Sequence, residues 1–528
     1  MPRLRLLLIL FLLMICLPAM AERRGDYPPK PTTVQGWRKA AAEDLAAIHT
    51  LLKKNHPAMV VDKGGESFKA WIDKGYEQAK RQIPDIRGEW DYYFLITHYV
   101  GGFRDAHIRI NRNAKYRYSD LQRWPGIILA YVDSHYVVRN VAPWLGERGP
   151  PVGAVLVTCD GYPVDALARA RLDAYFDNLD LEGGRYRTAP LLLLDLGNTY
   201  APLPRACWFK GQSGGRMYPL EYRAPPPEND LQAEINAAAG YGPAPPLGLS
   251  QPAPGLWWIT LSSMAPSGEN WNAFLAEIKA HLADIRAAHQ VVIDLRANWG
   301  GSDLVPQRLA SLLWGDDFFS SHQPASGRAL YRVTPLVVGK YREMERQSAG
   351  VYAAATPETG SQMGMILQRA LDHGKPSHTF MNGLGRTGDA IAPADPIAGQ
   401  VILLTDYACV SACLDGVDMM LPMPNTILAG RDTGADTIFG SIIRTPLPSL
   451  RWSLYFSVNA AIDRCRGNNI PYRPLPGFRF RGDITDTAAV QAWVQHLPPT
   501  PADWGATGPG CPRSQPQPPH PPPSIIMD

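Results

Sequence analysis

Charge of one sign does not gather anywhere in this 528-residue sequence, where 52 Lys and Arg residues nearly balance 49 Asp and Glu residues. The formal net charge is only +3, so the basic footprint of a nucleic-acid-binding protein is missing. Long apolar runs are lacking too: the run over 6–17 is shorter than the roughly 20 residues that span a bilayer. We therefore expect no nucleic-acid partner and no stable membrane span.

Cysteine is scarce, and no His or Cys pair close to Cys409 and Cys413 completes a zinc set. The N-terminus has Arg3 and Arg5, then the apolar run, then Ala19-Met20-Ala21. That pattern predicts a signal peptide over 1–21 and export to the periplasm or the medium.

Removal of the signal peptide takes away Cys16 and leaves six cysteines, an even number that permits disulfides. For Cys409 and Cys413 we expect a structural disulfide that involves one of them, with Cys465 as its candidate partner.

Hydrophobic periodicity divides the rest of the chain. Helical patterns cover 37–54, 67–82 and 90–100, and short strands with turns follow. A proline-rich stretch over 225–254 is typical of a linker. The predicted units are an N-terminal helical module (35–115), a β-rich module (120–224), a catalytic domain (250–497) and a disordered Pro-rich tail (498–528).

Strands and helices alternate in the predicted catalytic domain. The strand over 291–295 is apolar throughout, which indicates burial on both faces, as in an α/β core. The mixed segment 336–380 is an insertion without an assigned role.

Ser411 lies between the apolar strand 401–404 and a helical pattern that ends at Pro422. At such a turn the hydroxyl is exposed, and the Ala412 amide points out of the helix N-terminus. Acyl transfer needs that pair, an attacking oxygen and a donor for the oxyanion. The alternative is that Ser411 only caps the helix.

Two other places carry chemistry of the same kind. Gly300 and Gly301 follow the buried strand 291–295 and precede a helix, so their amides can face a negative charge or simply form a turn. A phosphate-binding loop is excluded because no Lys-Ser/Thr follows the glycines. His107 begins an alternating run after a loop and is either a general base or a structural histidine.

Three motifs together resemble the C-terminal processing (tail-specific) serine peptidase family. Residues 294–301 match its D-L-R-x-N-x-G-G, residues 408–413 are similar to the segment around its nucleophile, and Asp105-Ala106-His107 resembles the D-x-H of its histidine-using branch. The resemblance covers about 37–493. It implies a multi-domain α/β (α+β) fold with an N-terminal helical module, a PDZ-like module and a ClpP/crotonase-like α/β catalytic core. Gly153 to Val164 carries the PDZ likeness, with a plain β-rich spacer as the alternative.

In this family the resemblance implies Ser411 as nucleophile, His107 as general base, and an oxyanion hole from Gly300 or Gly301 with Ala412. It implies a polypeptide substrate and no cofactor or metal. The lysine of the family's other branch is missing from 432–437, which excludes a Ser-Lys dyad.

The family's late glutamate is missing as well, since 464–471 contains none. A histidine base needs a group that fixes its tautomer. Asp463, Asp105 or Asn469 would serve here. Two alternatives remain open, a peptide-binding relative with a weak or retired active site and a small-substrate esterase or amidase. The sequence assigns no oligomeric state.

Overall fold

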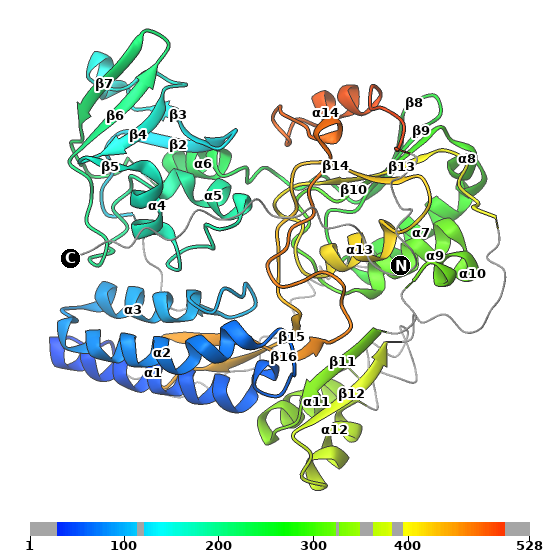
Figure 1. Cartoon of the computed structure of the whole chain (residues 1–528), viewed down its shortest axis with the longest axis horizontal. Coiled ribbons are helices and arrows are strands. Elements are labelled where there is room, and N and C mark those ends of the chain that lie inside the picture. The colour runs from blue at the N-terminus through cyan, green and yellow to red at the C-terminus, as the bar shows by residue number, and fades with distance from the viewer. Residues whose placement is uncertain are drawn as a thin grey trace, which may run out of the picture.

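The computed structural model describes residues 29–112, 121–226, 228–323, 327–348, 363–382 and 394–501. The predicted signal peptide, Cys511 and the tail from 502 onward lie outside these residues. Within the described residues, no helix combines the length and the apolar character needed to cross a membrane. These residues form three sheets with helices between them (Figure 1), and the predicted mixed multi-domain fold class is confirmed.

Three helices open the described chain: α1 (Val34–Asn55), α2 (Glu66–Gln82) and α3 (Glu89–Gly101). Their apolar faces share one core with two strands from the far end of the chain, β15 (Phe439–Pro446) and β16 (Trp452–Ala461). Figure 1 shows the blue helices beside these orange strands. The first helices are therefore tied to the part of the chain that follows Ser411.

The strand after His107 belongs to the sheet of β16. β1 (Arg109–Arg112) pairs antiparallel with β16, and β11 (Gly327–Arg332) and β12 (Ser377–Asn382) continue that sheet. Between β11 and β12 lie α11 (Pro335–Ser348) and α12 (Met363–Asp372), so the predicted insertion extends this sheet.

The β-rich unit is a six-stranded sheet in the order β2-β3-β4-β6-β7, with β5 on β4. Its elements are β2 (Ile127–Val132), β3 (His135–Val141), β4 (Val155–Cys159), β5 (Tyr162–Pro163), α4 (Val164–Leu172), α5 (Glu182–Thr188), β6 (Ala206–Gly211) and β7 (Gly214–Pro219). A disulfide between Cys159 and Cys207 joins β4 to β6.

The segment predicted as a linker is not one. It contains α6 (Glu228–Ala238) and β8 (Gly248–Ala253). Leu231 and Ile235 of α6 pack into a core with β2, so the prolines interrupt ordered structure instead of separating domains. The prediction rested on the proline content of this segment and gave no weight to its two apolar positions in α6.

The second five-stranded sheet has the order β14-β13-β10-β9-β8, and its strands are parallel except for β8. Its elements are β9 (Leu256–Thr260), α7 (Gly268–Ala280), α8 (Leu282–Ala287), β10 (Gln290–Asp294), α9 (Leu304–Trp314), β13 (Gln400–Thr405), α13 (Ala412–Met420), β14 (Thr426–Gly430) and α14 (Thr487–Val494). Helices α7 and α8 meet at His281.

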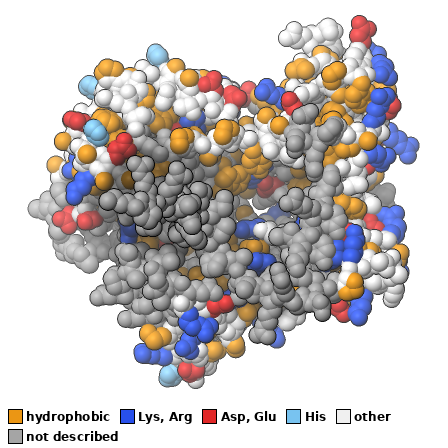
Figure 2. All heavy atoms as spheres, turned by 180° about the vertical axis from the view of Figure 1, so that it is seen from behind, with side chains coloured by type: hydrophobic (Ala, Val, Ile, Leu, Met, Phe, Trp, Pro, Cys, Tyr) orange, Lys and Arg blue, Asp and Glu red, His pale blue; other side chains and the backbone are white. Residues whose placement is uncertain are grey.

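Both faces of this sheet are covered, which explains the continuous apolar strands. Helices α7, α9 and α13 share a core with one face, and α14 packs on the other. The loops after β10 and β13 leave the sheet at the same edge, because neighbouring parallel strands end together. Figure 2 shows the molecule from behind, with charges of both signs scattered over the visible surface.

Gly101, at the end of α3, packs so closely on the β-rich unit that a larger side chain there should destabilise the protein. A Cβ there would lie 2.0 Å from the carbonyl oxygen of Ala174 in the β-rich unit. Gly101→Ala should lower the free energy of unfolding by about 1–3 kcal/mol in urea titrations, because neither backbone can yield freely. Gly88→Ala, before the same helix, meets nothing within 4 Å and is the matched control. Equal midpoints for the two variants would contradict this packing.

Candidate active site

Ser411 occupies the turn between β13 and α13 with φ 56° and ψ −128°. A non-glycine residue rarely adopts such a backbone, and strain of this kind concentrates at functional turns such as strand-to-helix nucleophile elbows. The Ser411 side chain makes no capping hydrogen bond to α13. The geometry therefore speaks against a simple helix cap.

His107 lies directly across from Ser411. Its Nε2 is 3.4 Å from Ser411 Oγ, although 304 positions separate the two residues in sequence. The imidazole side chain is only 10% exposed. Strand β1 begins two residues later and pairs with β16, which fixes the backbone that carries the ring. The two predicted residues thus meet at the outer limit of hydrogen-bond distance.

Asp105 lies on the other side of the imidazole. Its Oδ1 accepts a hydrogen bond from the His107 amide at 2.9 Å and lies 3.7 Å from His107 Nδ1. The Thr437 hydroxyl donates to Oδ2 at 3.0 Å. Burial raises the pKa of the Asp105 carboxyl, while the His107 charge and these two donors act in the opposite direction. Of the three predicted orienting residues, Asp105 is the one placed against the ring.

Asp463 and Asn469 are engaged elsewhere. The carboxylate of Asp463 binds Arg328 on β11 with two contacts at 2.7 and 2.8 Å. The Asn469 amide donates to the carbonyl oxygen of Arg104 at 2.8 Å. Asn469 therefore holds the loop before Asp105 rather than the imidazole, and Asp463 belongs to an ion pair at the insertion.

The glycine loop after β10 packs closely against the turn at Ser411. A Cβ on Gly300 would lie 2.7 Å from the Val410 carbonyl oxygen and 2.9 Å from Ser411 Cβ, and its φ is +87°. Only glycine fits that position. The Gly300 amide donates to Asn298 Oδ1 at 2.9 Å, and the Asn298 side chain in turn donates to the carbonyl oxygen of Leu261.

The aspartate and the arginine of this motif have a framework role. Arg296 forms a buried ion pair with Asp294, with contacts at 2.9 and 2.7 Å, and also donates to the carbonyl oxygen of Ile484 at 2.7 Å. Trp258 donates to the same aspartate. These bonds anchor the loop at the end of β10 to the segment before α14.

Asp406 joins the two loops and was not singled out from the sequence. Its carboxylate accepts two hydrogen bonds of 2.9 Å from backbone amides. One is the amide of Ala297, at the start of the glycine loop, and the other is that of Ala408, three residues before Ser411. Burial raises the pKa of Asp406 to about 6. An aspartate directly after a buried parallel strand was the signal that could have found it.

A disulfide between Cys409 and Cys413 links the two sides of the turn at Ser411. The prediction of Cys465 as the partner is therefore wrong; Cys465 is itself disulfide-bonded. Cys409 and Cys413 stand on either side of Ser411 with their Cα atoms 5.2 Å apart, so the turn itself brings the two nearest candidates together.

Helix α5 of the β-rich unit also contacts the loop that precedes Ser411. Arg187 donates to the carbonyl oxygen of Tyr407 at 2.9 Å and to Asp177 at 2.8 Å. The Tyr407 hydroxyl donates to Glu182 at 3.0 Å. The position of this unit is thereby coupled to the residues just before Ser411.

A second charged group lies behind the imidazole. Asp436 binds Arg464 at 2.8 Å and Arg466 at 2.5 Å, and the positive charges of these arginines and His107 lower its pKa against the effect of burial. It lies in segment 432–437, which lacks the lysine of the family's other branch.

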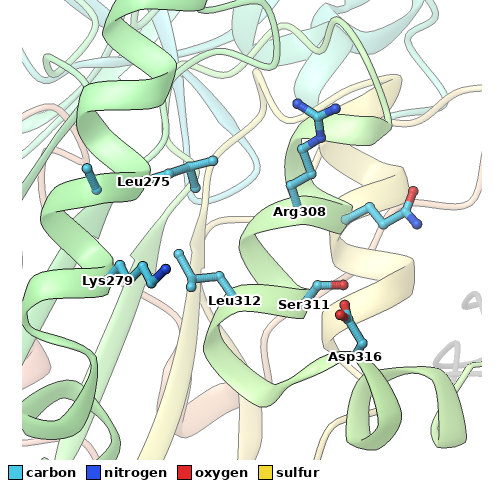
Figure 3. A pocket seen from close by; sticks show the side chains of 8 residues that line it. Leu275, Lys279, Arg308, Ser311, Leu312 and Asp316 are labelled. Carbon is cyan, nitrogen blue, oxygen red and sulfur yellow. The ribbon is translucent and has the colours of Figure 1, made fainter. Parts of the chain in front are cut away.

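An open depression between α7 and α9 is separate from this site. Figure 3 shows Leu275 and Lys279 facing Arg308, Ser311 and Leu312 across it. None of the predicted catalytic residues lines it. Within the described ranges, no group of three or more His, Cys, Asp or Glu side chains is arranged to hold a metal.

Scanned against models of protein families the sequence matches none, and a search of curated proteins also finds no match. Solved structures do match. Mature CPAF complexed with lactacystin is 14% identical, with 87% of this chain and 97% of that chain covered and a TM-score of 0.53. A CPAF variant with a serine replaced by alanine gives 15% identity, coverage of 83% and 92%, and a TM-score of 0.54. A photosystem II D1 C-terminal processing protease is 12% identical, with coverage of 84% and 93% and a TM-score of 0.31.

Other matching structures are named as proteases or peptidases. At these identities, the two CPAF structures show a shared fold over most of both chains. The resemblance indicated by the motifs is thus confirmed at the level of the fold.

Asp406 gives a prediction for stability against pH. Its carboxyl keeps its proton up to about pH 6 when folded and releases it near the ordinary pKa of 3.8 when unfolded. Folding therefore takes up a proton between these values, and this contribution to stability decreases as the pH rises. The Tm of the parent minus that of Asp406→Asn should fall from about pH 4 to about pH 6.

Asp463→Asn is the control for this measurement. Its hydrogen bond with Arg328 lowers the pKa of Asp463, so that difference curve should slope the other way, with stability lost as the pH falls. A flat Asp406 difference curve would show that the carboxylate is not desolvated between the loops.

Proposed function

We propose that this protein is an exported serine-type endopeptidase that cleaves polypeptides through an acyl-enzyme. The observation that carries the proposal is the 3.4 Å approach of His107 Nε2 to Ser411 Oγ on a strained strand-to-helix turn. A nucleophile paired with a base in a partly enclosed site is the arrangement that acyl transfer needs. The serine peptidase neighbours support the same class of reaction.

In the proposed reaction, Ser411 Oγ attacks the carbonyl carbon of a peptide bond, and its proton passes to His107 Nε2. The tetrahedral intermediate collapses, the C–N bond breaks, and His107 returns the proton to the leaving amine. The acyl group now forms an ester with Ser411. A water molecule then attacks this ester with the same base, which releases the acid and restores the serine.

Two backbone amides would bind the oxyanion. The Ala412 amide lies in the first turn of α13, where it has no acceptor within the helix. The Gly300 amide is already bound to Asn298, so Gly301 is the better second donor of the two predicted glycines. One donor of this kind is typically worth about 3–4 kcal/mol of the barrier.

Asp105 takes the part of the missing glutamate in this proposal. As an ionised carboxylate beside His107 Nδ1, it would hold the tautomer that leaves Nε2 free to accept a proton. The separation of 3.7 Å is too long for a hydrogen bond, and catalytic hydrogen bonds are often long until substrate binds.

Two further parts of the proposal concern substrate and location. The β-rich unit contacts the nucleophile turn through Arg187 and Tyr407, which suits a PDZ-like module that presents an extended peptide to the site. Two disulfides, Cys159–Cys207 and Cys409–Cys413, favour an oxidising compartment and so support export.

A retired active site that only binds peptides is the less favoured alternative. Such a protein has no need to keep Ser411 at a positive φ, which costs about 1–3 kcal/mol, nor a glycine pressed against it. An esterase or amidase would use the same residues and differs only in its preferred substrate.

Ser411→Ala should abolish covalent labelling by a fluorophosphonate probe and cleavage of an unfolded polypeptide, because both reactions need the hydroxyl. Gel fluorescence and peptide mass spectrometry measure the two reactions, and circular dichroism checks that the variant is folded. Labelling of the variant at the parental rate would overturn the proposal. If the parent protein is labelled and cleaves small esters but leaves polypeptides intact, the esterase alternative is favoured.

Asp105→Asn should slow probe labelling on the order of 10³- to 10⁴-fold, as loss of the negative charge does in the Ser-His-Asp template. The control is Asp463→Asn, which removes a carboxylate bound to Arg328 and should label at the parental rate. Similar losses for both variants would mean that Asp105 has no special relation to His107.

A further inference from the structure

A second histidine, His56, faces Asp105 from the opposite side. It lies directly after α1 and is fully buried, with its ring stacked on Phe68 and edge-on to Phe439. Its Nδ1 accepts a hydrogen bond from the Ala58 amide at 3.2 Å. An acceptor at Nδ1 in a neutral imidazole places the proton on Nε2. His56 therefore presents an N–H group at Nε2.

That N–H group lies close to the carboxylate of Asp105. His56 Nε2 is 3.9 Å from Asp105 Oδ2, and both His56 Nε2 and His107 Nδ1 are buried atoms without a hydrogen-bond partner among the described residues. Buried polar atoms are nearly always satisfied, so two such atoms facing one carboxylate need an explanation.

We propose that His56 is a positioning residue whose Nε2–H group holds the Asp105 carboxylate ionised and aimed at Nδ1 of His107. The inference rests on the proposed function and extends the catalytic array from Ser411, His107 and Asp105 to a fourth side chain. It assigns a role in the reaction to a residue that directly follows α1, in the N-terminal helical part of the chain.

The environment of Asp105 explains why such a donor is needed. No lysine or arginine binds this carboxylate within the described residues, and the neighbouring Asp436 disfavours its charge. The His107 amide and the Thr437 hydroxyl donate hydrogen bonds to it, and the Nε2–H group of His56 lies 3.9 Å from Oδ2. Each hydrogen bond to the charged form favours that form, so in the proposed arrangement a third neutral donor joins these two in place of a cation.

His56 acts in this way as a neutral ring. Its complete burial, together with the charge of His107, lowers the pKa of His56 to about 3. It therefore neither accepts the proton of Ser411 nor competes with His107 as a base. Its contribution is a fixed donor, held by the Ala58 amide on one edge and by Phe68 on its face.

A pair of variants separates this role from a structural one. In His56→Asn the side-chain oxygen keeps the place of Nδ1 and still accepts from Ala58, but the donor at the Nε2 position is lost. In His56→Gln the amide nitrogen reaches the Nε2 position and donates to Asp105, while the contact with Ala58 is lost. The test is the rate of fluorophosphonate labelling of the full chain against pH, beside thermal unfolding of each variant.

The proposal predicts that His56→Asn labels about tenfold to a hundredfold more slowly than the parent, whereas His56→Gln retains most of the rate. Thermal stability should rank the pair in the opposite order. His98→Asn is the matched control, since this histidine packs on Tyr175 in the same helical unit without facing Asp105, and it should label at the parental rate. If the labelling rates of the two variants fall in proportion to their thermal stability, the proposal is overturned.

A double-mutant cycle gives the second measurement. In an Asp105→Asn background, His56→Asn should cause no further loss, because the group that it positions has been neutralised. Full additivity would contradict the proposal. If the proposed function itself is wrong, Ser411→Ala will be labelled like the parent. If only this inference is wrong, Ser411→Ala will not be labelled, and His56→Asn will be labelled at the parental rate.

Discussion

The close approach of Gly300 to the turn at Ser411 is the constraint on which the site depends. A side chain at position 300 would overlap the Val410 carbonyl oxygen, so only a bare backbone lets the loop after β10 lie beside the loop after β13. Asp406 holds the two loops at that distance by binding an amide in each. With the loops fixed, the serine hydroxyl and the amides around it share one small space.

His107 reaches this space along a separate route. His107 precedes β1, which pairs with β16, and β16 shares its core with the first three helices. The N-terminal and C-terminal parts of the chain must therefore be assembled before the imidazole faces Ser411. Such contacts between distant segments are entropically costly to close, which explains why a large shared core accompanies a site of a few residues.

The sequence predicted the site better than its support. Strand-turn-helix patterning and three motifs in order led to Ser411, His107 and the glycine loop, because those residues need particular neighbours in the chain. The roles of Thr437 and His56 could not be predicted, because they arise only when distant segments meet. Asp406, helix α6 and the partner of Cys409 are different, since local features pointed to them: a buried strand before Asp406, two apolar positions in α6, and the short spacing of Cys409 and Cys413.

Solving the structure of the fluorophosphonate adduct tests the central claim most directly. The account predicts phosphorus bonded to Ser411 Oγ, a phosphonyl oxygen within hydrogen-bond distance of the Ala412 amide and a glycine amide of the loop after β10, and His107 Nε2 beside Oγ. An adduct on another residue, or an oxygen turned away from the Ala412 amide and the glycine loop, would contradict it.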